Sequence, residues 1–231
     1  MDFKIETFAS VSSTQDKAIE LLNTGASEGL VVQAMSMENG RGRQGNAWHA
    51  PMGNLYLSIV LRPDISEADC GQMSFVAALA VVETARSLTD EDLKINVKWP
   101  NDVLVEGKKL AGILIDKQGS AYILGVGINI LAAPEYATAL QAHSDKRLPI
   151  NPVRDFFLDV FDAYYTKWLN EGFENIQEQW MRKAEFLNEK IGVRLSSREE
   201  QGIFKGIDQD GALLLETTDG TRRFVSGEVF I

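Results

Sequence analysis

A loop rich in glycine and arginine, placed between two apolar strands, constrains this sequence more than any other feature. The loop Gly40–Trp48 reads Gly-Arg-Gly-Arg-Gln-Gly-Asn-Ala-Trp, and the apolar segment Asn54–Leu61 follows it. From Asn39 to Arg62 there are three arginines and no acidic residue. Glycine lets backbone amides approach a ligand closely, and a guanidinium binds carboxylate or phosphate through two parallel hydrogen bonds. The loop therefore predicts an anion-binding site.

Three common nucleotide-binding motifs are excluded, one by the residues that follow these glycines and two because their defining residues are absent from the chain. Gly40, Gly42 and Gly45 match the dinucleotide fingerprint in spacing, but that fingerprint needs a helix directly after the glycines. Here Pro51, Gly53 and then a strand follow. A protein-kinase loop also lies between strands, yet the His-Arg-Asp and Asp-Phe-Gly motifs of kinases are absent, as is a Walker A motif. The anion site must belong to another class of protein.

The overall charge and the cysteine content limit the possible partners and compartment. Acidic residues outnumber basic residues 33 to 23, for a formal charge of −10. Nucleic-acid phosphates repel a protein of this charge, so we expect no nucleic-acid partner. The single cysteine, Cys70, excludes an internal disulfide and suits the reducing cytoplasm. The start of the chain is no signal peptide, and no apolar run could cross a membrane, so we expect a cytoplasmic protein without membrane contact.

Strand patterns and helix patterns are mingled along most of the chain, which predicts an α+β fold with a mixed β-sheet flanked by helices. Apolar runs predict strands at Lys4–Phe8, Leu30–Ala34, Asn54–Leu61, Ile95–Trp99, Val103–Val105, Leu110–Ile115 and Tyr122–Asn129. Capping signals predict a helix that starts after Ser13, with Asp16 completing the cap, and one that starts after Ser66 and ends near Leu88.

A second group of helices is expected after an irregular stretch. Asn151 as the cap and Pro152 at the first helical position start a long helix that ends at Gly172, and Phe173 starts a further helix through about Ala184. The long helix carries an apolar stripe that we interpret as core: Val153, Phe156, Phe157, Val160, Phe161, Tyr164 and Trp168.

The character of the sequence changes near Leu187. Short alternating strands separated by turns are expected at Val193–Ser196, Ile203–Ile207, Leu213–Glu216 and Arg222–Val225. This pattern predicts a small β-barrel over residues 188–231, after a larger domain over residues 1–187. At this length the barrel is marginal alone, so we expect it to pack against the larger domain.

A second block, Lys98–Asp102, reads Lys-Trp-Pro-Asn-Asp and lies where a predicted strand ends. Proline prevents a regular continuation of the strand, so Asn101 and Asp102 are expected at a bend. Glu106–Gly107 then predicts a hairpin turn that places Lys108 or Lys109 at the start of the next strand. A lysine at such a position is usually just solvated.

A third block, Gly125–Asn129, reads Gly-Val-Gly-Ile-Asn at a strand end. Its two glycines permit close approach of another group, which is a ligand or a packed side chain. Together, and in this order, the blocks resemble the biotin–protein ligases. The shared motifs are Ser13-Thr14, Gly40–Trp48, Asn54-Leu55-Tyr56, Lys98–Asp102, Lys109–Leu114, Gly125–Asn129 and the tail Gly206–Glu216.

The resemblance covers nearly the whole chain and implies a class II synthetase-like biotin/lipoate ligase fold with an SH3-like C-terminal barrel. It also implies a two-step reaction. The carboxylate of biotin attacks the α-phosphate of ATP, which gives biotinyl-AMP and pyrophosphate. A lysine amine on a biotin carboxyl carrier protein then attacks this mixed anhydride, and AMP leaves. ATP and Mg²⁺ are therefore implied, and a homodimer is possible.

The resemblance also implies roles for individual residues. The main catalytic cation would be Lys109, with Arg41 and Arg43 closing over the carboxylate and the α-phosphate. The implied biotin-binding residues are Ser13, Thr14, Gln15, Arg41, Gly42, Arg43, Lys109, Gly112 and Gly125. The implied nucleotide-binding residues are Arg43, Trp48, Asn101, Lys109 and Asn129, and Asp102 would help to hold Mg²⁺.

Three positions depart from the family pattern. Met37 stands where the family usually has a glutamine that faces biotin, and Gln44 and Asn46 stand where it often has arginines. Each lost charged hydrogen bond is worth roughly 1.5–3 kcal/mol. Three consequences of these departures are considered: weaker biotin binding, faster loss of the intermediate, or a different acyl substrate.

Three other functions compete with an active biotin ligase. A lipoate or octanoate ligase uses a related fold, although Lys98–Asp102 and the predicted barrel argue against it. A non-catalytic small-molecule-binding relative fits the three departures. A biotin-sensing repressor would need a DNA-binding domain, but the ligase motifs start at Ser13, and the negative charge also argues against this function.

Overall fold

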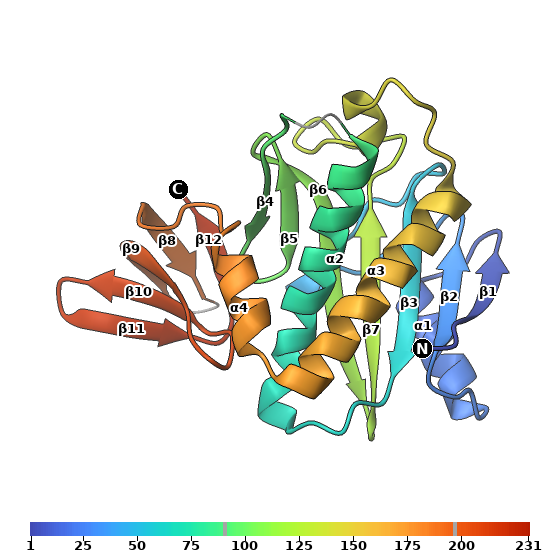
Figure 1. Cartoon of the computed structure of the whole chain (residues 1–231), viewed down its shortest axis with the longest axis horizontal. Coiled ribbons are helices and arrows are strands. Elements are labelled where there is room, and N and C mark those ends of the chain that lie inside the picture. The colour runs from blue at the N-terminus through green and yellow to red at the C-terminus, as the bar shows by residue number, and fades with distance from the viewer. Residues whose placement is uncertain (90–91, 196–197) are drawn as a thin grey trace.

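The computed structural model describes residues 1–89, 92–195 and 198–231, and contains two β-sheets with helices against the larger one (Figure 1). The larger sheet has seven strands in the order β1-β2-β3-β7-β6-β5-β4. Strands β1 and β2 are parallel, and every other neighbouring pair is antiparallel, so the predicted mixed sheet and α+β class are confirmed. The strands are β1 (Lys4–Phe8), β2 (Leu30–Ala34), β3 (Leu55–Leu61), β4 (Ile95–Lys98), β5 (Asp102–Val105), β6 (Lys108–Gln118) and β7 (Ala121–Ile128).

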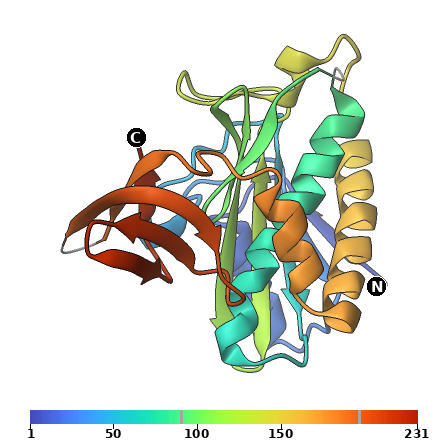
Figure 2. The same ribbon diagram turned by 60° about the vertical axis from the view of Figure 1, so that its left-hand side comes forward.

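Helices cover both faces of this sheet (Figures 1 and 2). Successive strand residues point to opposite faces, so each strand supplies two separate apolar clusters. Val31 joins the large cluster under α2 and α3, whereas Val32 joins a small cluster with Ala18 of α1. The face that carries α1 is therefore opposite to the face that carries α2 and α3. The helices are α1 (Thr14–Asn23), α2 (Gln72–Leu88), α3 (Ile150–Glu171) and α4 (Glu174–Met181).

The C-terminal segment forms a second, antiparallel sheet of five strands in the order β11-β10-β9-β8-β12. Within the described residues β11 and β12 are edge strands without mutual pairing, so the sheet is open rather than the closed barrel that the sequence predicted. The strand β12 was not predicted, and Ser196, the predicted end of a strand, lies outside the described residues. The strands are β8 (Lys190–Arg194), β9 (Glu199–Ile207), β10 (Leu213–Thr217), β11 (Gly220–Phe224) and β12 (Glu228–Phe230).

The starts of two helices differ from the prediction. The Ser66 hydroxyl accepts the amide of Asp69 and caps a short 3-10 helix, Glu67–Gly71, instead of α2 itself. Helix α3 starts at Ile150, so Asn151 lies within its first turn and is not the cap. Pro152, its third residue, is tolerated there because the first amides of a helix have no intrahelical acceptor.

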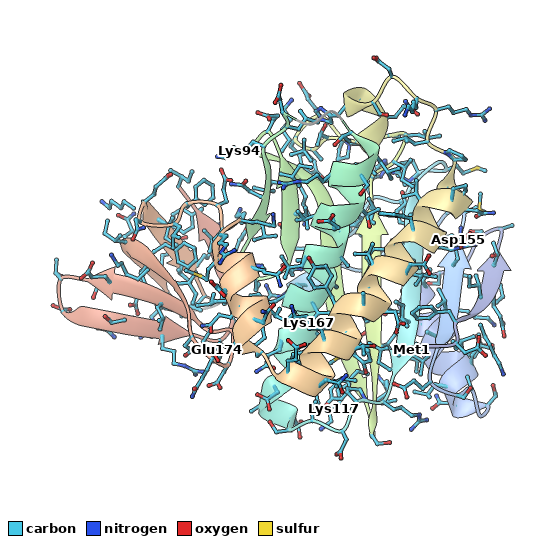
Figure 3. The ribbon with its side chains drawn as sticks, in the orientation of Figure 1. Met1, Lys94, Lys117, Asp155, Lys167 and Glu174 are labelled. Atoms are coloured by element: carbon cyan, nitrogen blue, oxygen red, sulfur yellow. The ribbon has the colours of Figure 1, made fainter. Side chains whose placement is uncertain are left out.

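The apolar stripe of α3 is mostly core, as predicted, with one exception. Val153, Phe157, Phe161 and Trp168 are buried, but Phe156 is 39% exposed. The amino terminus lies beside this helix, where the Met1 ammonium is 2.8 Å from a carboxylate oxygen of Asp162 (Figures 1 and 3).

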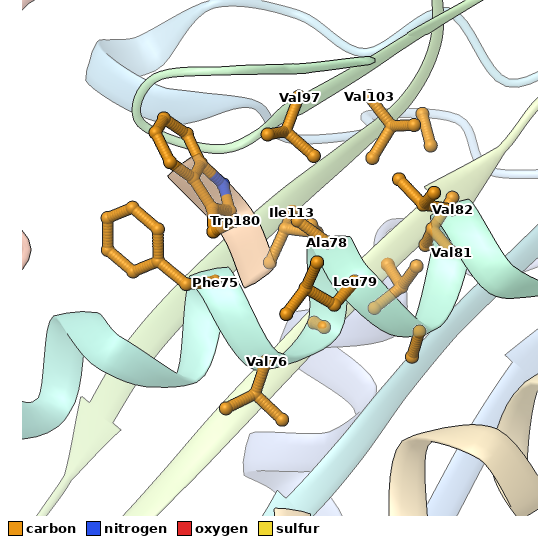
Figure 4. Close-up of a cluster of buried hydrophobic side chains, with 14 of the residues drawn as sticks. Phe75, Val76, Ala78, Leu79, Val81, Val82, Val97, Val103, Ile113 and Trp180 are labelled. Carbon is orange, nitrogen blue, oxygen red and sulfur yellow. The ribbon is translucent and has the colours of Figure 1, made fainter. Parts of the chain in front are cut away.

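An aromatic cluster joins the larger domain to the C-terminal sheet. The Phe75 ring of α2 makes an edge-to-face contact with Trp180 of α4, with 5.2 Å between ring centroids (Figure 4). It makes a second edge-to-face contact with Phe173, at 5.5 Å. A Cβ atom on Gly211 would lie only 2.5 Å from the Phe75 ring, and the Gly211 carbonyl accepts the indole N–H of Trp99 at 3.0 Å. The turn before β10 therefore packs directly on the core of the larger domain.

Candidate active site

A cavity of about 1030 Å³, including its open mouth, lies on the sheet face opposite α2 and α3. Its walls come from the start of α1, the loop after β2, the bend between β4 and β5, strands β6 and β7, and the start of β12. The cavity brings together all but one of the predicted ligand-binding residues: Ser13, Thr14, Gln15, Arg41, Gly42, Arg43, Trp48, Asn101, Asp102, Lys109, Gly112 and Gly125.

The first turn of α1 supplies a buried polar floor. The Ser13 hydroxyl caps the helix by accepting the amides of Gln15 at 3.2 Å and Asp16 at 3.5 Å, which confirms Ser13 as the cap. The Asp16 carboxylate, which was predicted to complete the cap, pairs with Arg41 at 3.0 Å instead. The Ser58 hydroxyl lies 2.9 Å from the Thr14 hydroxyl and donates to it. Ser13, Thr14 and Gln15 are each less than 5% exposed, so their polar groups face the cavity or the protein and have little contact with bulk water.

One acceptor on this floor is free for a ligand. The Gln15 side-chain amide donates to the Ile123 carbonyl at 3.3 Å, while its Oε1 atom is buried and has no partner in the described part of the chain. An unpaired buried acceptor costs about 1–3 kcal/mol, which a ligand N–H would recover. Gly125 makes room for Gln15, because a Cβ there would lie 3.0 Å from Gln15 Cδ.

The glycine- and arginine-rich loop is folded over the cavity as a compact unit, Gly40–Trp48, which we call the cap. The Gly42 amide donates to the Asn46 carbonyl at 2.7 Å, and the Trp48 amide donates to the Gly40 carbonyl at 2.8 Å. The cap thus holds itself together through backbone hydrogen bonds, and its two ends meet at the Gly40–Trp48 contact.

The cap closes against the sheet through Trp48. Cβ atoms on Gly112 and Gly127, which pair across β6 and β7, would each lie 2.8 Å from the indole ring. The two glycines therefore form a flat seat for the indole. The indole N–H is buried without a hydrogen-bond partner among the described residues.

Two cations converge inside the cavity. The Lys109 Nζ atom lies 2.7 Å from an Asp102 carboxylate oxygen and 5.2 Å from the centre of the Trp48 ring. The Arg43 guanidinium lies 3.5 Å from Asn101 Oδ1 and 3.4 Å from the Gly227 carbonyl oxygen. Burial lowers the pKa of Arg43, and nearby Asp102 partly offsets the shift, yet arginine stays protonated at neutral pH. An anion that enters the cavity meets both charges.

The hairpin that positions Lys109 forms as the sequence predicted. Glu106 and Gly107 both have positive φ, 49° and 74°, as a tight hairpin turn of the mirror-image type requires. The turn places Lys108 at the start of β6 and Lys109 next to it. Lys109 then faces the cavity, whereas the Lys108 side chain is exposed to solvent.

Asn129 is the predicted site residue that the cavity does not include. It is 3% exposed, and its side-chain amide donates to the Thr138 carbonyl at 3.1 Å. These contacts anchor the segment after β7, which lies along Lys109, since the Thr138 amide donates to the Lys109 carbonyl at 2.9 Å. A nucleotide contact from Asn129 stays a prediction.

Several wall residues were not among the predicted ligand-binding residues. Gly227, Glu228 and Val229 reach the cavity from the C-terminal sheet, and no local pattern pointed to them. Met37 also lines the cavity, where its sulfur accepts the Thr14 amide at 3.4 Å. The departure of Met37 from the family pattern was the signal that could have identified it.

The described residues contain no group of three or more His, Cys, Asp or Glu side chains that could hold a metal ion. No helix in the described ranges is long and apolar enough to span a membrane.

The chain is similar to known proteins in both its larger part and its C-terminal part. The sequence profile of the biotin/lipoate A/B protein ligase family matches residues 7–131, and that of the biotin protein ligase C-terminal domain matches residues 186–231. The chain is 34% identical over 238 residues to the biotin–[acetyl-CoA-carboxylase] ligase of Paracoccus denitrificans, covering 96% of this chain and 98% of the relative. It is 33% identical to the bifunctional ligase/repressor BirA of Bacillus subtilis, covering 95% of this chain and 71% of the relative.

A solved structure agrees with the sequence matches. The biotin protein ligase of Aquifex aeolicus in complex with biotin and ATP superposes with a TM-score of 0.87 at 28% identity, covering 98% of this chain and 97% of that one. Two family profiles and a relative of nearly the same length thus agree: the chain belongs to the biotin/lipoate A/B protein ligase family.

Proposed function

We propose that this protein is an ATP-dependent ligase that attaches biotin to a lysine of a biotin carboxyl carrier protein. The observation that carries the proposal is one cavity in which a buried polar floor, at Ser13–Gln15, opens toward two cations, Lys109 and Arg43. A ligand that fills it needs a polar ring with N–H groups at one end and a negative charge at the other. Biotin has a ureido ring and a carboxylate, and ATP supplies the second anion.

The first step forms a bond between a carboxylate oxygen of biotin and the α-phosphorus of ATP, and pyrophosphate leaves. Two anions must meet, so repulsion is the main barrier. Lys109 and Arg43 lower it by placing positive charge where both groups lie, in a site already organised for them. In this proposal Asn101 and Trp48 contact the nucleotide, and Gly42 contributes its backbone close to the acyl chain.

The second step joins the amine of the acceptor lysine to the carbonyl carbon of biotinyl-AMP. AMP leaves, an amide forms and the amine loses a proton. Among the site residues Ser13, Thr14 and Gln15 keep the ring in place during both steps, with Gln15 Oε1 accepting a ureido N–H. We place the reaction in the cytoplasm, where a carrier would meet a protein whose single cysteine is free.

Mg²⁺ is expected to enter with ATP. The cavity places the Asp102 carboxylate beside Lys109, at 2.7 Å. A single carboxylate fits an ion that is held mostly by phosphate oxygens, as Mg²⁺ is in many nucleotide sites. Asp102 would contact the ion, which neutralises phosphate charge when bound.

Pyrophosphate release tests the choice of acid. Biotin is expected to stimulate release from Mg-ATP, and lipoate is expected neither to replace biotin nor to compete with it. The reason is the polar floor, because the apolar dithiolane ring of lipoate would leave Gln15 Oε1 unpaired. Equal stimulation by lipoate would favour the lipoate or octanoate ligase. Biotin binding by calorimetry without any pyrophosphate would favour a binding protein.

The seat of Trp48 provides a test of the closed cap. Gly127→Ala places a methyl group 2.8 Å from the indole, so the ring must move and carry the cap with it. Overpacking of this kind costs about 1–3 kcal/mol. We expect biotin affinity, measured by calorimetry, to fall by a corresponding factor. Gly71→Ala is the matched control, since its added methyl meets nothing within 4 Å. Equal affinity of the two variants would show that the indole seat does not matter.

A further inference from the structure

Arg41 differs from the other loop arginine in what it contacts. Its Nη2 atom lies 2.7 Å from Asp116 Oδ2 and 3.0 Å from Asp16 Oδ1, and its side chain is 41% exposed. Asp16 belongs to the first turn of α1, directly after the polar floor, and Asp116 belongs to β6. One guanidinium therefore joins the cap, α1 and the sheet at the rim of the cavity.

The two carboxylates compensate the charge of Arg41. The ammonium of Lys109 pairs with a different carboxylate, that of Asp102, inside the cavity. Among the residues that the structure describes, Arg43 has no such acidic pair, and its guanidinium contacts Asn101 and Gly227. Of the two loop arginines, Arg43 is thus the one that can bind an anionic ligand, whereas the charge of Arg41 is already paired with carboxylates of the protein.

The backbone hydrogen bonds within the cap make the contact at Arg41 important for the position of the whole loop. The cap is closed on itself by backbone hydrogen bonds between Gly42 and Asn46 and between Gly40 and Trp48. A unit folded in this way moves as a body, so a contact at Arg41 restrains all of it. In the described residues the pairs with Asp16 and Asp116 are the ion pairs that the cap makes.

We infer that Arg41, Asp16 and Asp116 form a latch that holds the cap over the cavity and slows escape of the acyl-adenylate before the acceptor lysine arrives. This inference rests on the proposed function for the identity of the retained molecule. Arg41 is then a positioning residue, which acts through the cap. The latch ties retention to the ring end of the site, because Asp16 follows the residues that form the floor.

Neutralising the acids one at a time and together tests the latch. Exposed ion pairs are worth about 0.2–1 kcal/mol each, so Asp16→Asn and Asp116→Asn are each expected to speed adenylate release up to about 5-fold. The double variant is expected to exceed either single variant. The rate of pyrophosphate formation at saturating substrates stays at the wild-type value, because Lys109 and Arg43 are untouched. Glu178→Gln, which removes an exposed ion pair between Glu178 of α4 and Arg182, is the matched control.

The salt dependence of adenylate release and a conservative substitution of Arg41 distinguish the latch from a purely structural role. Added salt screens exposed pairs, so it speeds release from the wild type and leaves the double variant nearly unchanged. Arg41→Lys keeps a charge that reaches the acids and retains more adenylate than Arg41→Ala. Release at the wild-type rate from the double variant, with the same salt dependence, would overturn the latch.

Cleavage of the free protein by trypsin separates the latch from the proposed function. Arg43 lies in the cap, and cleavage after it requires the cap to open. Without any substrate, the double variant is expected to be cut there several-fold faster than the wild type and Glu178→Gln. Equal cleavage would also overturn the latch. Suppose that the wild type forms no pyrophosphate, while the double variant is still cleaved faster than the wild type. This combination would refute the proposed function and support the latch.

Discussion

Lys109→Ala is expected to slow pyrophosphate release about 10²–10³-fold, corresponding to roughly 2.7–4 kcal/mol for the loss of one group that stabilises transition-state charge. The ammonium lies inside the cavity, 2.7 Å from Asp102 and against the face of Trp48. As biotin approaches ATP, negative charge shifts between the carboxylate and the phosphate. A fixed ammonium between them stabilises that charge more than it stabilises either separate anion.

The measurement is a single-turnover assay of pyrophosphate with biotin and Mg-ATP. Lys108→Ala is the control, because Lys108 precedes Lys109 on the same strand but has an exposed side chain. Surface substitutions usually change free energies by no more than about 0.5 kcal/mol, so this variant should stay within a few-fold of the wild type. Near-normal release by Lys109→Ala would remove Lys109 from its proposed role, and an equal loss in Lys108→Ala would indicate a general charge effect.

Phe75→Ala is expected to lower the free energy of unfolding by about 3–5 kcal/mol, as for other large aromatic residues removed from a core. Phe75 is 3% exposed and contacts Phe173, Trp180 and the turn at Gly211. Its removal leaves a cavity where α2, α4 and the C-terminal segment meet. Because that segment also supplies Gly227 to the active-site cavity, we expect activity to fall as well.

Urea unfolding followed by circular dichroism measures the loss. Phe156→Ala is the matched control, since it removes the same side chain from a position on α3 that is 39% exposed. Its expected cost is well under that of Phe75→Ala. Equal costs for the two variants would contradict the assignment of Phe75 to the junction between the domains.

Local signals in the sequence were enough for most of the fold. Three features each depend on a few neighbouring residues, and each was predicted correctly. They are Ser13 as the residue that caps α1, the turn at Glu106–Gly107, and the apolar strand β3 that follows the loop Gly40–Trp48. The start of α3 was not, because Pro149 and Asn151 both suit a helix start and packing decides between them. Strand β12 is only three residues long, and its pairing with β8 comes from distant sequence.

The candidate site was predictable where motifs carry chemistry, and less so where the fold alone brings residues together. Lys109 and Arg43 come from two separate blocks of the sequence, and the cavity joins them. The contribution of Gly227 could not be foreseen, since a glycine before an unrecognised strand carries no signal. The ion pairs of Arg41 with Asp16 and Asp116 could not be predicted either, because they depend on the position of the cap relative to α1 and β6.

The proposed transfer of biotin to lysine is tested most directly by weighing the acceptor. The protein is mixed with biotin, Mg-ATP and a biotin carboxyl carrier domain, and the carrier is analysed by mass spectrometry. We predict a gain equal to biotin less one water on a single lysine, present with ATP and absent without it. An unmodified carrier, together with no biotin-dependent pyrophosphate, would contradict the account.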